Sequence, residues 1–128
     1  MRCGVVAVVM AGLVLAAPAF AFDAGLSKSV KSRATAEIRA CGDGKCTAAA
    51  LKKAAGRFSD RPDYRSVAVA LNGVARAVGA CAKTCEGKKA EEVKSLVSGY
   101  RAEIAGAGRS EIKTLASIFD PSIYKVLR

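Results

Sequence analysis

The stretch that decides the fold is YRSVAVALNGVARAVGACAKTC, residues 64–85. Its apolar and cysteine residues recur at alternating steps of three and four, which places them on one face of a helix. These residues are Tyr64, Val67, Leu71, Val74, Val78, Cys81 and Cys85. Arg65, Asn72 and Arg76 fall on the opposite face, where water can solvate them. The stretch therefore predicts an amphipathic helix whose buried face carries two cysteines near its end.

The same periodicity elsewhere in the chain predicts an all-α domain, a small disulfide-stapled bundle of four to five helices. The expected helices cover about 24–40, 48–58, 62–85, 88–105 and 110–119, with a short final turn at 121–127. Asp23 can cap the first helix, Asp43 or Thr47 the second, and Ser110 the fifth, while Pro62 suits a first helical turn. No run after residue 21 alternates convincingly at period two, so we expect no β-sheet.

Residues 1–21 resemble a secretory signal peptide. A basic Arg2 precedes the apolar run 5–17, and Ala19-Phe20-Ala21 has the small-x-small pattern of a cleavage site. The alternative is a retained anchor, but the run is shorter than the roughly 20 residues that a membrane-spanning helix needs. We expect a single exported domain at 22–128. Residue usage rich in Ala, Gly, Val and Arg points to a bacterial gene, and thus to the periplasm or the medium.

Four cysteines remain after residue 21, an even number in a chain that we expect to enter an oxidising compartment. The predicted helices bring Cys41 and Cys46 to the same end of the bundle as Cys81 and Cys85. Our preferred connectivity is Cys41–Cys85 with Cys46–Cys81, and the pairing of Cys41 with Cys81 and Cys46 with Cys85 stays open. A Cys81–Cys85 bond is disfavoured because, within a continuous helix, the two Cβ atoms would be poorly placed.

Zinc is the alternative for these four cysteines, but thiols oxidise in an exported protein, and the spacings C-x4-C and C-x3-C are not the commonest for zinc. A redox role is disfavoured because neither pair has the C-x-x-C spacing of catalytic dithiols. We therefore assign a structural role to the cysteines, with no metal and no cofactor.

The chain is strongly basic, with 21 Lys and Arg against 11 Asp and Glu. Ten basic residues lie in 22–65 against five acids, and ten lie in 66–128 against six. Such a charge is either a solvated surface or a contact for an anionic partner, such as a membrane surface, an envelope polymer or an acidic protein. The candidate contacts on the first two helices are Lys28, Lys31, Arg39, Lys52, Lys53 and Arg57. Nucleic acid is disfavoured because aromatic residues for base stacking are few and occupy core positions.

Catalytic patterns are missing from the sequence. Histidine is absent, no serine lies in a G-x-S-x-G or supported S-x-x-K motif, and the glycines do not form a phosphate-binding loop. We therefore expect a non-enzymatic, macromolecule-binding or envelope-associated protein whose partner is an unknown protein or anionic envelope component. The alternatives are a secreted effector that acts on anionic lipid by peripheral contact and, second, a thiol redox or metal-handling protein. The apolar residues of 121–127 form either a lid on the bundle or an exposed docking strip.

Overall fold

The computed structural model describes residues 22–81, 85–119, 123, 124 and 127. In this part of the chain it is an all-α bundle of five α-helices and two 3-10 helices, without strands. The expected signal peptide, residues 1–21, lies outside the described residues.

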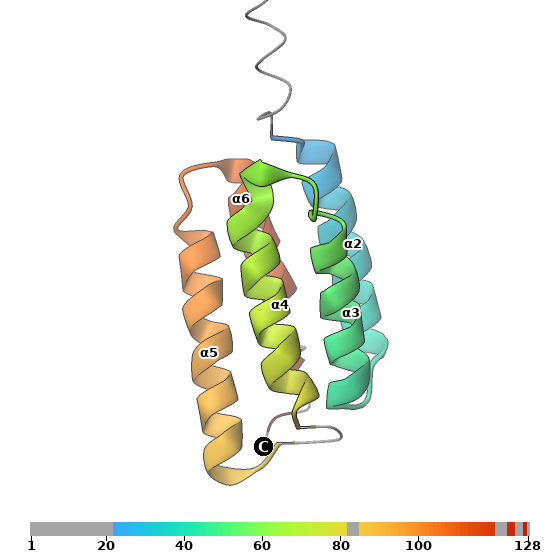
Figure 1. The fold of residues 1–128 in the computed structure, drawn as a ribbon, viewed down its shortest axis with the longest axis vertical. Helices are drawn as coiled ribbons and strands as arrows, with labels where there is room; N and C mark the ends of the chain where they lie inside the picture. The colour runs from blue at the N-terminus through green and yellow to red at the C-terminus, as the bar shows by residue number, and fades with distance from the viewer. Residues whose placement is uncertain (1–21, 82–84, 120–122, 125–126, 128) are drawn as a thin grey trace, which may run out of the picture.

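Four longer helices run antiparallel to their neighbours, and a shorter fifth segment closes the bundle from behind (Figure 1). The elements, in order, are α2 (Ala24–Ala40), α3 (Gly44–Gly56), η2 (Pro62–Tyr64), α4 (Arg65–Gly79), α5 (Gly87–Ala105), α6 (Ser110–Lys113) and η3 (Thr114–Phe119). Helix α3 packs against α2 and α4, α5 packs against α4 and η3, and η3 returns to α2. The helices thus form a closed ring around one core.

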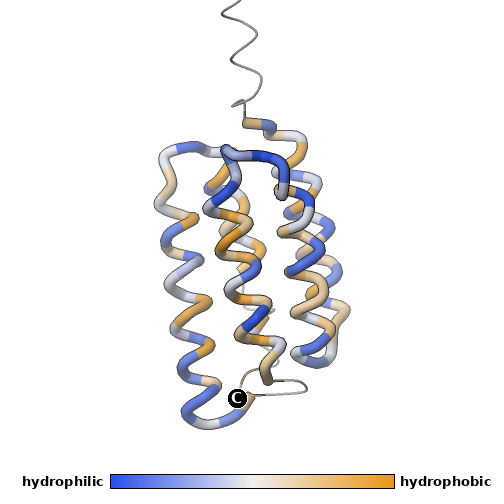
Figure 2. Tube along the Cα trace, viewed as in Figure 1, coloured by the Kyte–Doolittle hydropathy of each residue, from blue (hydrophilic) through white to orange (hydrophobic). Residues whose placement is uncertain are grey.

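Hydrophobic and hydrophilic residues alternate along each helix, as expected where every helix buries one side (Figure 2). The predicted seam of α4 is confirmed: Val67, Leu71, Val74 and Val78 are completely buried, as is Tyr64 just before the helix. The larger apolar residues of the final segment, Leu115, Ile118 and Phe119, fill the core from the opposite side.

Two predicted helix starts are confirmed by their caps. The Asp23 carboxylate accepts a hydrogen bond from the Leu26 N–H at 2.9 Å, and the Asp43 carboxylate accepts one from the Cys46 N–H at 2.7 Å. Because Asp43 is the cap, α3 begins at Gly44, four residues earlier than predicted. Ser110 is the first residue of α6 rather than its cap, and the expected helix 110–119 tightens to a 3-10 helix from Thr114 onward.

The preferred disulfide connectivity is wrong, and so is the open alternative. Cys41 is bonded to Cys46, with Cα atoms 5.4 Å apart, and Cys81 is bonded to Cys85, with Cα atoms 5.0 Å apart. The prediction failed because helix α4 ends at Gly79 and does not continue to Cys85. Beyond the helix the chain can turn back on itself, so the objection to a bond across one helical turn does not apply.

The two disulfides nevertheless lie at the same end of the bundle, as the topology predicted. Helix α2 ends and α3 begins at the lower end in Figure 1, where α4 also ends. At that end α4 and α3 lie so close together that a Cβ atom placed on Gly79 would be 3.2 Å from the Ala48 Cβ. The bonded cysteines are only five and four residues apart in the sequence, so each disulfide stabilises a local connection and neither joins two distant segments.

The described part of the C-terminal segment packs on the bundle. Ile123 is completely buried, Leu127 is 6% exposed, and a parallel β-bridge joins Leu127 to Cys85. The Tyr124 hydroxyl forms a hydrogen bond with the Ser98 hydroxyl of α5 at 2.9 Å. These residues favour the lid over the docking strip, while the rest of 121–127 lies outside the described residues.

Candidate anion-binding surface

Positive charge is concentrated on α2 and α3. These two helices carry seven basic residues, namely Lys28, Lys31, Arg33, Arg39, Lys45, Lys52 and Lys53, and a single acid, Glu37. Helix α5, which is of similar length to α2, carries four basic residues and three acids. Within their bounds these two adjacent helices have six more basic than acidic residues, while the carboxylates of Asp23 and Asp43 cap their first turns. We call their exposed side the α2–α3 basic surface.

The six predicted contact residues all lie on or next to this surface, but they divide between the two sides of α2. Lys28, Lys31 and Arg39 face the side where α2 meets α6 and η3. On the other side, the Lys53 ammonium lies 3.4 Å from the Glu37 carboxylate, and Arg57 lines a shallow hollow with Arg33 and Glu37. Lys52 points to solvent from α3.

The Lys53–Glu37 ion pair has little energetic weight because both side chains are well solvated, at 62% and 34% exposed. Exposed pairs of this kind contribute about 0–1 kcal/mol. Each side of α2 thus carries three cations and one acid: Arg33, Lys53 and Arg57 with Glu37 on the α3 side, and Lys28, Lys31 and Arg39 with Glu111 on the side facing η3.

Two hollows lie end to end between α2 and the α6–η3 segment, and Lys31 lines both of them. The first is lined by Ala24, Ser27, Lys28, Lys31, Ser110, Glu111 and Thr114, and the second by Lys31, Ser32, Thr35, Ala36, Arg39 and Ser117. Their volumes are about 230 and 420 Å³. We call this pair of hollows the α2–η3 groove.

The groove is lined by cations and hydroxyl groups. One wall carries Lys28, Lys31 and Arg39 at helical spacing, so these side chains follow one side of α2. The other wall carries Glu111 from α6 and Thr114 and Ser117 from η3. Thr114 and Ser117 lie roughly in register because residues i and i+3 eclipse in a 3-10 helix. Among the described lining residues Glu111 is the single acid.

One hydroxyl on the groove has an unmet hydrogen-bonding capacity. The Thr35 Oγ1 atom is buried and has no hydrogen-bond partner, although Thr35 lines the second hollow. Its neighbour across the groove, the Ser117 hydroxyl, donates to the Thr114 carbonyl at 3.0 Å and keeps its lone pairs for another donor. A buried hydroxyl without a partner costs free energy, so a side-chain rotation that brought this hydroxyl to a ligand in the hollow would relieve that cost.

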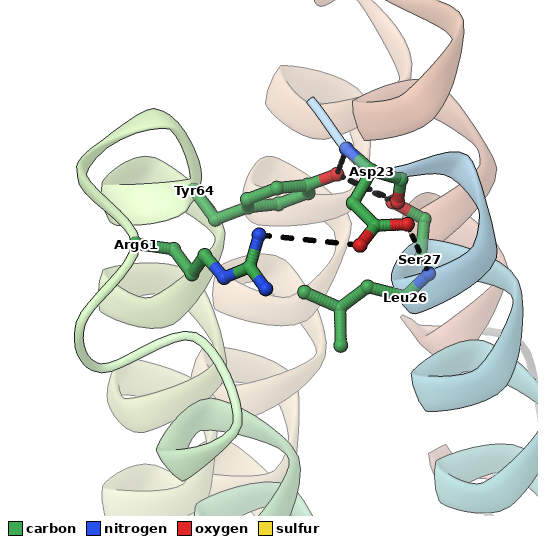
Figure 3. Close-up of polar contacts among 5 residues, drawn as sticks. All are labelled: Asp23, Leu26, Ser27, Arg61 and Tyr64. Atoms are coloured by element: carbon green, nitrogen blue, oxygen red, sulfur yellow. Dashed lines mark hydrogen bonds and ion pairs between the residues drawn. The ribbon is translucent and has the colours of Figure 1, made fainter. Parts of the chain in front are cut away.

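The N-terminal end of the α2 wall is fixed by Tyr64 (Figure 3). The Tyr64 hydroxyl accepts a hydrogen bond from the Asp23 N–H at 2.9 Å, donates to the Asp23 carbonyl at 3.0 Å, and lies 2.9 Å from the buried Ser27 hydroxyl. The Tyr64 ring stacks on Phe58 at 4.7 Å, and Phe22 meets its edge at 5.7 Å. The wall is thus held before any ligand arrives.

The groove contains no large apolar side chain. The large hydrophobic residues that are exposed in the described part of the chain are Val69 on α4, 56% exposed, and Leu96 on α5, 37% exposed. Neither lies on α2, α6 or η3. Among the described residues, none of the helices is both long and apolar enough to cross a membrane.

Cysteine chemistry is restricted by the two disulfides. All four cysteines that were candidates for zinc or redox chemistry are paired in bonds, so they present no thiolate to a metal. The described residues also contain no cluster of three or more potential metal ligands.

Sequence analysis missed the hydroxyl residues Ser32, Thr35, Thr114 and Ser117 as groove residues. A helical projection of α2 places Thr35 on the same side as Lys31 and Arg39, so Thr35 could have been predicted as a groove residue from the sequence. The opposite wall had no signal, because it depends on η3 packing against α2.

Comparison with known protein families, with curated proteins and with solved structures gives no match to this chain. The function has to be argued from the residues themselves.

Proposed function

We propose that this protein is a non-catalytic exported module that binds an anionic macromolecule of the cell envelope or its surroundings through the α2–α3 basic surface. The observation that carries the proposal is the seven-to-one ratio of basic to acidic residues on α2 and α3, against four to three on α5. A cluster of like charges raises the local potential and attracts polyanions.

Export is part of the proposal. Disulfides form and persist in oxidising compartments, and two of them are present in this small domain. A chain cleaved before Phe22 would keep the contacts of Phe22 with Tyr64 and with Arg109, whose guanidinium lies 4.6 Å from the Phe22 ring centre. The mass and N-terminal sequence of the protein recovered from periplasm and medium test this part. A protein found intact in the cytoplasm would contradict it.

The binding test compares two charge-matched double variants. Lys45→Glu/Lys52→Glu reverses two exposed cations on α3, and Lys88→Glu/Lys89→Glu reverses two exposed cations on α5. Both change the net charge by the same amount, so a partner attracted only by overall charge would lose affinity equally for both. We expect the α3 variant to bind an anionic polymer such as dextran sulfate at least several-fold more weakly than the α5 variant.

Salt provides the second arm of the test. Binding through solvated charges weakens as the Debye length shortens from about 30 Å at 0.01 M to about 8 Å at physiological ionic strength. We expect retention on the polymer to fall steeply over this range. Absence of binding at low salt, or equal losses in the two variants, would refute the α2–α3 basic surface as a binding surface.

A further inference from the structure

The geometry points to the α2–η3 groove as a binding site for a linear acidic polysaccharide. This inference rests on the proposed function, and it narrows both the place and the partner. Within the α2–α3 basic surface, the groove is the feature with two walls, a row of cations and a row of hydroxyl groups.

The shape of the site favours an extended ligand. The lining residues of α2 run from Ala24 to Arg39, which corresponds to roughly 22 Å at 1.5 Å per residue. The two hollows share Lys31 as a lining residue and follow one another along α2, so a chain lying along this helix would pass both.

The chemistry of the lining favours an acidic sugar polymer. Lys28, Lys31 and Arg39 provide positive charge for carboxylate or sulfate groups. Ser32 and Ser110 provide donors and acceptors for sugar hydroxyls, Thr35 does so after rotation about χ1, and Thr114 and Ser117, whose O–H groups donate to backbone carbonyls, provide acceptors. The lining contains no aromatic ring on which a nucleobase could stack.

A lipid surface fits the groove less well. A peripheral membrane protein usually adds buried apolar area to its electrostatic attraction. The exposed large apolar residues of the described part, Val69 and Leu96, lie on α4 and α5 and not on the groove. The concave shape of the groove suits a chain that lies between two helices better than a flat bilayer.

Thr35 allows the site to be tested by a substitution that does not change the charge of the protein. Its Oγ1 is buried without a partner in the free protein, and threonine in a helix populates two χ1 rotamers, so rotation about χ1 can move the hydroxyl to a different position. A sugar hydroxyl in the second hollow would give this group the partner that it lacks.

The experiment measures the binding of the exported protein to polygalacturonate and to vesicles containing phosphatidylglycerol. Lys28→Glu/Lys31→Glu alters the groove, and Lys45→Glu/Lys52→Glu, with the same charge change, alters the basic surface outside it. We expect the groove variant to lose at least tenfold more affinity for polygalacturonate than the α3 variant. The unfolding midpoint of each variant confirms that it is folded.

Equal losses in the two variants would overturn the groove and leave the proposed function standing, whereas no binding by the unaltered protein would overturn both. Tighter binding to the vesicles than to polygalacturonate would overturn the choice of a polysaccharide. Thr35→Val with Ser117→Ala tests the sugar contacts without a change in charge. We expect a several-fold loss of affinity at an unfolding midpoint no lower than that of the unaltered protein, since valine removes an unpartnered buried hydroxyl. An unchanged affinity would overturn the assignment of a sugar ligand.

Discussion

Replacing Tyr64 by phenylalanine isolates the hydroxyl group that fixes the first turn of α2. The substitution keeps the ring, and with it the stacking on Phe58 and the edge contact with Phe22. It removes one hydroxyl that has contacts with the Asp23 N–H, the Asp23 carbonyl and the Ser27 hydroxyl. The loss of stability therefore reports on hydrogen bonding and not on a cavity.

The largest part of this loss comes from Ser27. Its side chain is 1% exposed, so its hydroxyl would be left in the core without the Tyr64 partner. A buried polar group stranded in this way costs about 1–3 kcal/mol. Asp23 is only partly buried, so water can replace Tyr64 there at a smaller cost. We expect Tyr64→Phe to lower the free energy of unfolding by about 2 kcal/mol.

Ser27→Ala is the second single variant of a double-mutant cycle with Tyr64→Phe. Alone it leaves Tyr64 bonded to the Asp23 backbone, and alanine has the higher helix propensity, so we expect a loss of at most about 1 kcal/mol. In the Tyr64→Phe background it removes the stranded hydroxyl, so the double variant should be more stable than the sum of the single losses by about 1 kcal/mol.

Urea unfolding followed by far-ultraviolet circular dichroism measures the free energy of unfolding of the unaltered protein, the two single variants and the double variant. The chain offers a matched control in Tyr124 and Ser98, whose hydroxyls form the same kind of bond at the same 2.9 Å but in solvent. Tyr124→Phe should cost less than about 0.5 kcal/mol, because water replaces the lost partner. If the Tyr64 and Ser27 losses add to within about 0.3 kcal/mol, or if Tyr64→Phe is as mild as the control, the reasoning is refuted.

Replacing Cys41 and Cys46 by alanine opens a loop of only a few residues, so thermal unfolding should show a cooperative fold less stable by about 2 kcal/mol. A loss near 4 kcal/mol would instead be typical of a long-range bond. On α5, Gly87 has a φ of 61° and Gly99 has open space beside it. Alanine should therefore destabilise at position 87 by about 1–2 kcal/mol and stabilise at position 99 by about 0.5–1 kcal/mol, with a reversed order of midpoints contradicting the backbone geometry. Ile123→Ala should cost about 2–5 kcal/mol because the side chain is completely buried. A cost below about 0.5 kcal/mol would show that the C-terminal segment does not cap the core.

The helical class and the core were predictable because both follow from local patterns. The spacing of Val67, Leu71, Val74 and Val78 specifies one face of a helix whatever surrounds it. The caps at Asp23 and Asp43 depend on a side chain and an N–H three residues away, so they too can be recognised from sequence.

The end of α4 was not predictable in the same way. The apolar pattern continues through Cys81 to Cys85, and no proline marks a boundary. Helix α4 nevertheless ends at Gly79, before either cysteine, and the two cysteines are bonded to each other. The expectation of a continuous helix led directly to the wrong pairing.

The second wall of the groove was hidden for a related reason. Ile112, Leu115 and Ile118 are three residues apart, a spacing that fits one side of a short α-helix as well as a 3-10 helix. Thr114 and Ser117 would share one face in either helix type, and it is the packing of η3 against α2 that turns this face toward the groove. Hydrophobic periodicity does not show which neighbour a short helix packs against, so this wall of the candidate site could not be predicted from it.

The two ends of α2 are fixed by different kinds of interaction, and this bears on how a ligand would use the groove. Tyr64 holds the first turn through hydrogen bonds, while the Cys41–Cys46 bond lies directly after the last turn. Lys28 is thus next to the hydrogen-bonded end and Arg39 next to the covalent end. With its frame held at both ends, the row of cations needs little ordering of the backbone on binding, so more of the electrostatic attraction remains as affinity.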